Sequence, residues 1–104
     1  MYERPQTITV DPTIPFSRMA EAILREWTQD EPTKEQIVVL GDIAYALARE
    51  SWEDLRTGIA LAGIQEPLAR KMWNLVVLDS WNVIAHDFFQ DRFRVISTIG
   101  EIHS

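Results

Sequence analysis

Residues 67–90 form the segment that most constrains how this chain can fold. The segment contains no glycine, has proline only at its first position, and carries one charge, Asp79, between Lys71 and His86. Proline is accommodated in the first turn of a helix because the N–H group that it lacks has no partner there. At a rise of ~1.5 Å per residue, one helix over this segment would be roughly 36 Å long. A domain of this size has a radius of gyration of ~13 Å, so we expect one long central helix at about residues 67–90.

Two further helices are indicated before this segment. Apolar residues at spacings of three and four predict a helix from Pro15 to about Thr28 with one apolar face. That face consists of Phe16, Met19, Ala20, Ile23, Leu24 and Trp27. Pro32 ends this element, because a proline pushes the preceding residue out of helical geometry. Residues 33–36 (Thr-Lys-Glu-Gln) have the form of a capping box, which predicts a second helix to about Glu50.

A serine followed by acidic residues predicts another helix start directly afterwards. Ser51 precedes Trp-Glu-Asp, and acidic side chains are favourable in the first turn of a helix. Gly63 is well placed to end this helix. We therefore expect a break after Glu50 and a separate helix over about residues 51–62.

The two ends of the chain carry short β-branched runs. Residues 1–15 contain three prolines and predict an extended arm, in which residues 7–10 suit a brief edge strand or an extended tail. Residues 92–102 suit either a short helix or a strand that pairs with the arm, and we favour the helix. The sequence as a whole predicts an all-α fold in one domain, residues 1–104. We expect a compact bundle or orthogonal array of four to five helices with the arm at one end.

The composition excludes several kinds of site. The chain has no cysteine, which excludes disulfides and thiolate metal sites. It has four glycines, and their positions do not form a phosphate-cradling loop, so we expect no cofactor. No apolar run reaches the ~18 residues of a membrane span, and the first residues lack the apolar core of a signal peptide. We therefore expect a cytoplasmic protein with no membrane partner.

The formal net charge of −6 argues against nucleic acid as the main partner. Binding to nucleic acid depends on Lys and Arg side chains that displace counterions from phosphates. An acidic surface suits a protein partner with a basic surface, because the electrostatic field would steer the two together. The same charge would also serve solubility alone.

The predicted long helix is apolar over more than half of its circumference. The apolar arc consists of Trp73, Val76, Val77, Leu78, Trp81, Ile84, Ala85 and Phe88. Burial of each large side chain is worth about 1.5–3 kcal/mol, so this arc needs a cover. Either the other helices wrap around it, or a second copy of the chain covers it in a homodimer.

The remaining side of the same helix carries the candidate site residues Asp79, Asn82 and His86. At 100° per residue these three and Gln90 fall within about 80° of one another. Asp79 and His86 lie two turns apart, ~10.5 Å, which is too far for a direct hydrogen bond but lets both reach one ligand. The three residues could bind a partner, or Asp79 could act as a base and His86 as a proton shuttle. They would equally form the solvated side of a buried helix, and they are too few to hold a metal ion.

Residues 59–73 resemble the helix-turn-helix of bacterial regulators, with the sequence Ile-Ala-Leu-Ala-Gly-Ile-Gln-Glu-Pro-Leu-Ala-Arg-Lys-Met-Trp. In that family a glycine and an apolar residue mark the tight turn, and Gly63 and Ile64 match them here. The resemblance implies that Gln65 contacts a base edge and that three cations contact phosphates. These cations are Arg56, Arg70 and Lys71. Two core helices joined at a glycine turn fit the same residues.

No catalytic constellation can be assembled from the sequence, so we expect a protein that is not an enzyme. The leading hypothesis is a small protein-interaction module: a regulator, adaptor or inhibitor that acts by occupying the surface of a macromolecular partner. A virus- or mobile-element-encoded inhibitor of a host machine is one such role. The alternative is a helix-turn-helix DNA-binding transcriptional regulator. The third hypothesis is a small enzyme that uses Asp79 and His86.

Overall fold

The computed structural model describes residues 6–97, which form three helices and two short strands. In chain order they are β1 (Gln6–Val10), α1 (Phe16–Thr28), α2 (Lys34–Ala62), α3 (Glu66–Phe89) and β2 (Phe93–Ser97). The protein is therefore mostly helical, as predicted, but the expected number of four to five helices is wrong. The structure also contains a small two-stranded sheet, which the expected all-α fold does not include.

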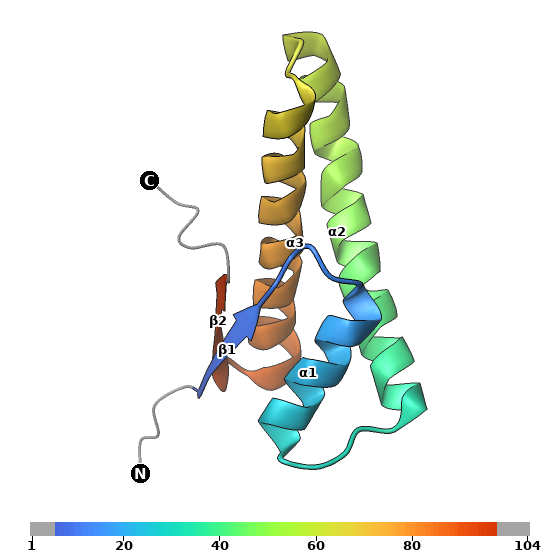
Figure 1. Cartoon of the computed structure of the whole chain (residues 1–104), viewed down its shortest axis with the longest axis vertical. Helices are drawn as coiled ribbons and strands as arrows, with labels where there is room; N and C mark the ends of the chain where they lie inside the picture. The colour runs from blue at the N-terminus through green and yellow to red at the C-terminus, as the bar shows by residue number, and fades with distance from the viewer. Residues whose placement is uncertain (1–5, 98–104) are drawn as a thin grey trace.

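The framework of the fold is an antiparallel hairpin of α2 and α3, which pack side by side (Figure 1). Helix α3 confirms the predicted long helix, because it spans 24 residues and begins and ends within one residue of the expected boundaries. Pro67 lies in its first turn, as predicted. Gly63 ends α2 with a left-handed φ of 65°, and its N–H group donates to the carbonyl oxygen of Ala60.

Helix α1 lies across one half of this hairpin and packs against α2 (Figure 1). Its predicted apolar face is confirmed, since Met19, Ala20, Ile23 and Leu24 are buried. The predicted capping box at the start of α2 is also confirmed. The Thr33 hydroxyl accepts from the Gln36 N–H group at 3.1 Å, and the Gln36 side chain accepts from the Thr33 N–H group at 2.9 Å.

Helix α2 continues through the break that we expected after Glu50. It is one helix of 29 residues, so the predicted separate helix over residues 51–62 is wrong. No proline or glycine stands near Ser51 to stop the helix, and the acidic residues that follow are tolerated on its exposed side. The apolar residues also stay in phase, because Ala44, Ala48 and Leu55 continue one stripe past Ser51. A start signal alone does not end the preceding helix.

The second correction concerns the end of the chain. Residues 93–97 form strand β2, so the favoured short helix over residues 92–102 is wrong for the part that the structure describes. Residues 98–102 lie outside the described residues. Strand β2 pairs in parallel with β1, with Gln6 opposite Phe93 and Val10 opposite Ser97. Of the two forms that residues 7–10 suited, the structure has the strand. Strand β1 is also the partner that lets the β-branched run in residues 93–97 form a strand.

The core lies where α1, the sheet and the second half of α3 meet. Trp81 is at its centre, fully buried, and stacks on Phe16 at a ring distance of 6.1 Å. Ile8 and Val10 of β1 and Phe93 of β2 close the core from the sheet side. Part of the apolar arc of α3 is therefore covered within one chain. Phe88 is an exception to the predicted arc, because 55% of its surface is exposed.

The indole N–H group of Trp81 has no hydrogen-bond partner among the described residues. A buried donor without a partner costs about 1–3 kcal/mol. The fold tolerates this cost because the large ring fills the space between α1, α3 and the sheet.

Within residues 6–97, no third layer covers the other half of the hairpin. Helix α1 and both strands lie beside the end of the hairpin where α2 begins and α3 ends, and the opposite end projects beyond them (Figure 1). The radius of gyration, 14.6 Å, exceeds the ~13 Å of a compact domain of this size. We call residues 55–75, which form the projecting part, the hairpin end.

Candidate binding surface

The hairpin end exposes several large apolar side chains. Leu61 is 84% exposed and Leu68 is 51% exposed, and Leu75 and Leu55 follow at 41% and 36%. Leu55 remains exposed because no third helix among the described residues reaches this part of the hairpin. Two helices packed on each other cover only the sides that face each other, which leaves apolar residues at the borders of the contact in water.

One face of the hairpin is hollowed between α2 and α3. This hollow, which we call the acidic groove, has a volume of about 440 Å³. Its lining consists of Ser51, Asp54, Leu55, Met72, Leu75, Val76 and Asp79. Four of these residues are apolar and two carry carboxylates, and no lysine or arginine contributes to the lining. Neither carboxylate forms an ion pair within residues 6–97.

A second hollow lies on the face of the hairpin that α1 packs against. Its volume is about 480 Å³, and it is lined by Tyr45, Arg49, Trp52, Glu53 and Trp73. The rings of Trp52 and Trp73 meet edge to face at 5.5 Å. Phe16 of α1 contacts both Tyr45 and Trp73 in the same manner, so the aromatic walls are partly held by α1. This hollow carries one charge of each sign and therefore does not select a charged partner.

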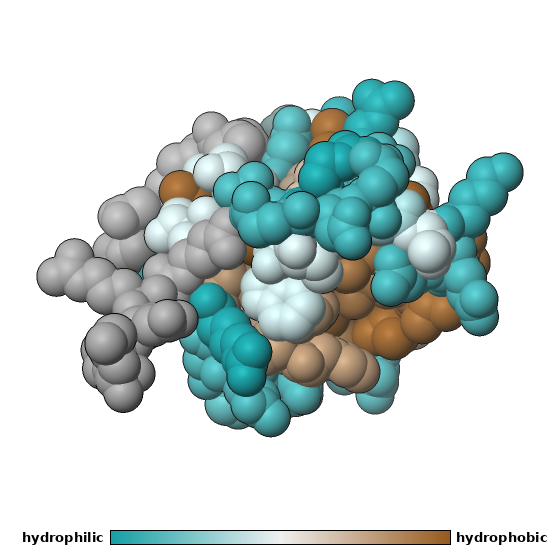
Figure 2. All heavy atoms as spheres, turned by 90° about the horizontal axis from the view of Figure 1, so that it is seen from below, coloured by the Kyte–Doolittle hydropathy of each residue, from teal (hydrophilic) through white to brown (hydrophobic). Residues whose placement is uncertain are grey.

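Apolar surface also occurs at the opposite end of the molecule. Figure 2 shows hydrophobic surface on the right of the view from below, on the side where α2 begins. Val38 and Val39 in the first turns of α2 are 54% and 52% exposed. These two residues do not line the acidic groove.

The structure separates the three predicted site residues Asp79, Asn82 and His86. All three are exposed on the solvent side of α3, as their spacing implied. Asp79 lines the acidic groove with residues of α2. Asn82 instead lines a smaller hollow of about 250 Å³ next to β2, and its amide donates to the carbonyl oxygen of Leu78 at 3.2 Å. Only Asp79 of the three thus lies in the acidic groove.

His86 has a carboxylate partner, but this partner is Asp91 and not Asp79. The imidazole Nδ1 lies 2.9 Å from Asp91 Oδ2 in the turn that follows α3, and Nε2 lies 3.9 Å from Asp87 Oδ1. The hydrogen bond and the charge of Asp91, with a smaller contribution from Asp87, raise the pKa of His86 above its usual value. Left-handed backbone at Gln90 and Asp91 brings the carboxylate back toward the helix. The contact stabilises the end of α3.

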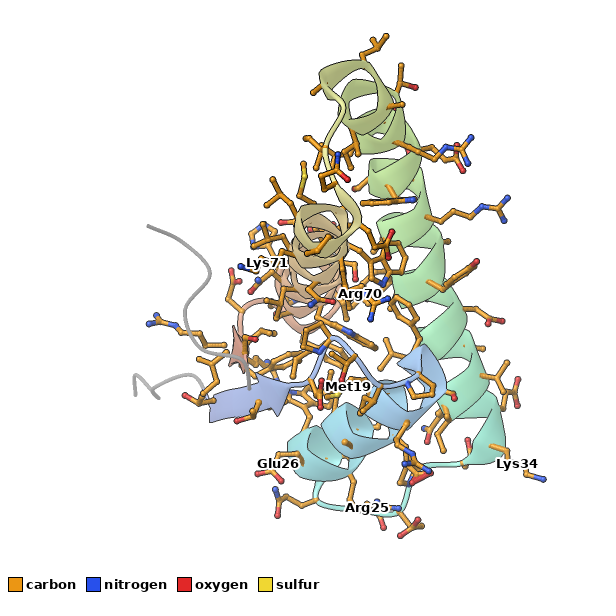
Figure 3. All side chains as sticks on the ribbon, turned by 45° about the horizontal axis from the view of Figure 1, so that its top comes forward. Met19, Arg25, Glu26, Lys34, Arg70 and Lys71 are labelled. Atoms are coloured by element: carbon orange, nitrogen blue, oxygen red, sulfur yellow. The ribbon has the colours of Figure 1, made fainter. Side chains whose placement is uncertain are left out.

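The residues that the helix-turn-helix resemblance singled out lie at or near the hairpin end. Arg56 and Arg70 lie beside carboxylates, at 3.7 Å from Glu53 and 3.5 Å from Glu66 respectively. Gln65 is the N-cap residue of α3. Arg70 and Lys71 leave α3 in different directions (Figure 3).

The two helices of this segment run antiparallel and side by side, whereas the helices of a helix-turn-helix cross at about 90–120°. The arrangement corresponds to the second reading of these residues, two helices joined at a glycine turn. It gives no support to the insertion of α3 into a DNA groove.

The groove residues of α2 were missed because the predicted break after Glu50 removed them from the neighbourhood of α3. One signal could have revealed this surface. Leu68 and Leu75 are seven residues apart within the predicted long helix, so they lie on the same side of it as Asp79, Asn82 and His86. Leucines on the otherwise polar side of a helix indicate an apolar surface that extends beyond the contact with its neighbours.

The described residues hold neither a metal-binding cluster nor a membrane span. Within residues 6–97, no three His, Asp or Glu side chains come close enough together to hold a metal ion. None of the three helices combines the length and the apolar character that a bilayer crossing requires. The chain matches no protein-family model, and no curated protein or solved structure is detectably similar to it. The function must therefore be inferred from the residues of this chain.

Proposed function

We propose that this protein is a non-enzymatic interaction module, a regulator, adaptor or inhibitor that acts by binding a protein partner through its hairpin end. The observation that supports the proposal is the exposure of four leucines, Leu55, Leu61, Leu68 and Leu75, in a part of the hairpin that no other described element covers. Large apolar side chains left exposed at one end of a molecule favour an interaction site there.

The energetic argument concerns what a partner would gain. Burial of a large apolar side chain is worth about 1.5–3 kcal/mol relative to exposure. Leu61 and Leu68 are more than half exposed and lie on either side of the turn between α2 and α3. A partner that covers both would gain a substantial part of this free energy, less the cost of ordering the side chains at the interface.

The test is capture of a partner from a native extract on the immobilised protein. The double variant Leu61→Ser/Leu68→Ser removes apolar surface from the hairpin end, and we expect it to lose the captured protein. Both side chains are exposed, so the variant should fold like the wild type, which circular dichroism and thermal unfolding would check.

The matched control is the double variant Val38→Ser/Val39→Ser, which removes two apolar side chains, each more than half exposed, from the other end of α2. We expect this variant to retain the partner. Capture that survives the leucine substitutions, or the absence of any specifically captured protein, would remove the support for the proposal. A solution mass of two chains that returns to one chain in the leucine variant would identify the partner as a second copy.

A further inference from the structure

The acidic groove has the shape of a docking site for a helix. Its walls come from two antiparallel helices, with Leu55 on the α2 side and Met72, Leu75 and Val76 on the α3 side. On the opposite face of the hairpin, α1 occupies the corresponding position over the other half and buries an apolar face there. No described element covers the acidic groove. A third helix is the element that completes a two-helix layer in helical proteins.

The charges around the groove indicate which charge a bound helix should carry. Asp54 of α2 and Asp79 of α3 stand on opposite walls of an otherwise apolar hollow, and neither meets a cation within the described chain. Carboxylates on both sides of an apolar groove favour an occupant with apolar side chains along its centre and cations along its flanks. The net charge of −6 adds a long-range attraction for such a segment.

We infer that the acidic groove binds a basic amphipathic helix of a partner protein. The apolar side chains of that helix would enter between Leu55 and Leu75, and its lysine or arginine side chains would flank Asp54 and Asp79. This inference rests on the proposed function and names the class of partner. It extends the binding surface from the exposed leucines of the hairpin end to a groove with a stated charge preference.

A second copy of the chain fits the groove less well than a basic helix. In a two-fold symmetric pair the same surface patch meets itself, so Asp54 and Asp79 of one copy would approach those of the other. Each copy also carries a net charge of −6. Like charges that face each other across an interface oppose association. The same argument applies to the phosphates of nucleic acid.

The experiment uses two designed helical peptides as probes. Both carry a leucine stripe at helical spacing on an alanine framework; one has lysine at the flanking positions and the other has glutamate. The full chain is titrated with each peptide. Calorimetry gives the affinity, and the shifts of the backbone amide NMR signals show where the peptide binds. We expect the lysine peptide to bind and to shift the amides of residues 51–55 and 72–79, and the glutamate peptide to bind at least about tenfold more weakly.

Three variants test whether the groove itself makes the contact. Asp54→Lys and Asp79→Lys should each weaken binding of the lysine peptide by about fivefold at low salt, since exposed charge pairs contribute modestly. Asp42→Lys changes the net charge by the same amount on an exposed position of α2 that does not line the groove, and it should alter affinity by less than about twofold. High salt should reduce the difference between the variants.

Several results would overturn the inference. Equal affinity for the lysine and glutamate peptides would show that the occupant is not selected by charge, and equal effects of Asp42→Lys and Asp54→Lys would show that only net charge acts. Amide shifts confined to another face would show that the groove is not the site, and absence of binding would contradict the class of ligand. None of these results bears on the capture experiment, in which the leucine variants test the proposed function independently.

Discussion

Two glycines of α2 occupy contrasting surroundings. A Cβ atom on Gly41 would lie 3.3 Å from the Cα atom and 3.4 Å from the backbone nitrogen of Ser17 in α1, whereas a Cβ atom on Gly58 would meet nothing within 4 Å. Glycine in a helix interior costs about 0.5–1 kcal/mol relative to alanine. At Gly41 the absence of a side chain lets α1 pack closely, and this packing offsets the cost of glycine. At Gly58 no such packing contact offsets the cost.

We therefore expect Gly58→Ala to raise the free energy of unfolding by about 0.5–1 kcal/mol. Gly41→Ala should give a smaller gain or a loss, because the backbone of α1 must move to admit the methyl group. Gly41→Val should lower the free energy of unfolding by about 1–3 kcal/mol through overpacking. Urea unfolding of the three variants measures these values. Equal gains from the two alanine substitutions would show that α1 does not pack closely on Gly41.

The contact between His86 and Asp91 makes stability depend on pH in a defined direction. Because Asp91 and Asp87 raise the pKa of His86, the folded state holds the imidazolium proton more tightly than the unfolded state does. The resulting stabilisation is fully present below the unfolded pKa of about 6.5. It is lost as the pH rises through the higher pKa of the folded state.

We expect the thermal midpoint of the wild type to fall, relative to that of His86→Gln, as the pH is raised from about 6 to about 8. The difference should be small because both side chains are exposed, and it should shrink further in Asp91→Asn. Thermal unfolding of the three proteins at several pH values checks this. A constant difference between wild type and His86→Gln across that range would contradict the contact.

At the scale of elements, the start of α2 differs from its middle. Thr33 is a true N-cap residue that exchanges two hydrogen bonds with Gln36. Ser51 has the same kind of sequence context but lies within a continuous helix. The two positions have similar helix-start signals in the sequence, but a helix begins only at Thr33 in the structure.

Thr33→Ala should lower the free energy of unfolding by about 1 kcal/mol, the usual cost of losing an N-cap. Ser51→Ala should be neutral or raise it by a few tenths of a kcal/mol, roughly the difference in helix propensity between the two residues. Chemical denaturation of the two variants side by side provides the measurement. A loss of similar size at Ser51 would indicate that a helix start exists there after all.

The elements that could be predicted from the sequence are those fixed by local signals. Pro67 and Gly63 set the boundaries of α3 and α2, and the capping box at Thr33 sets the start of α2. The continuity of α2 could not be predicted from a local start signal, because whether a helix continues depends on the partner along its stripe. Strand β2 depends on pairing with β1 at the other end of the chain, which no local pattern contains.

At the scale of the whole molecule, packing is uneven along the hairpin. Residues near Trp81 are covered by α1 and the sheet. Within the described residues, most of the hairpin end has only the contact between α2 and α3, although the ring of Trp73 also contacts Phe16 of α1. Regions with few buried apolar contacts open locally at a lower free energy than the rest of the molecule.

We expect backbone amides of residues 56–70 to exchange with solvent deuterium at least about tenfold faster than those of residues 76–85. A bound partner at the hairpin end should slow the faster group selectively. Hydrogen exchange followed by mass spectrometry or NMR tests both statements. Uniform protection along α3 would show that the hairpin end is as stable as the core.

The candidate site could be predicted only in part for the same reason. The spacing of Asp79, Asn82 and His86 correctly placed them on the exposed side of one helix. The acidic groove also needs Asp54 and Leu55, and these come from α2 through the antiparallel pairing of the helices. Such pairing is a property of the whole fold, and no spacing within α3 reveals which residues of α2 stand opposite.

The parallel pairing of β1 with β2 has a consequence for how the protein is made. During synthesis, β1 leaves the ribosome first and has no partner until residues 93–97 have emerged. The pairing also closes a loop that contains all three helices, and contacts of such long range slow folding. The helical hairpin can therefore assemble early, while β1, four of whose five residues are β-branched, stays unpaired and prone to aggregation until β2 has been synthesised.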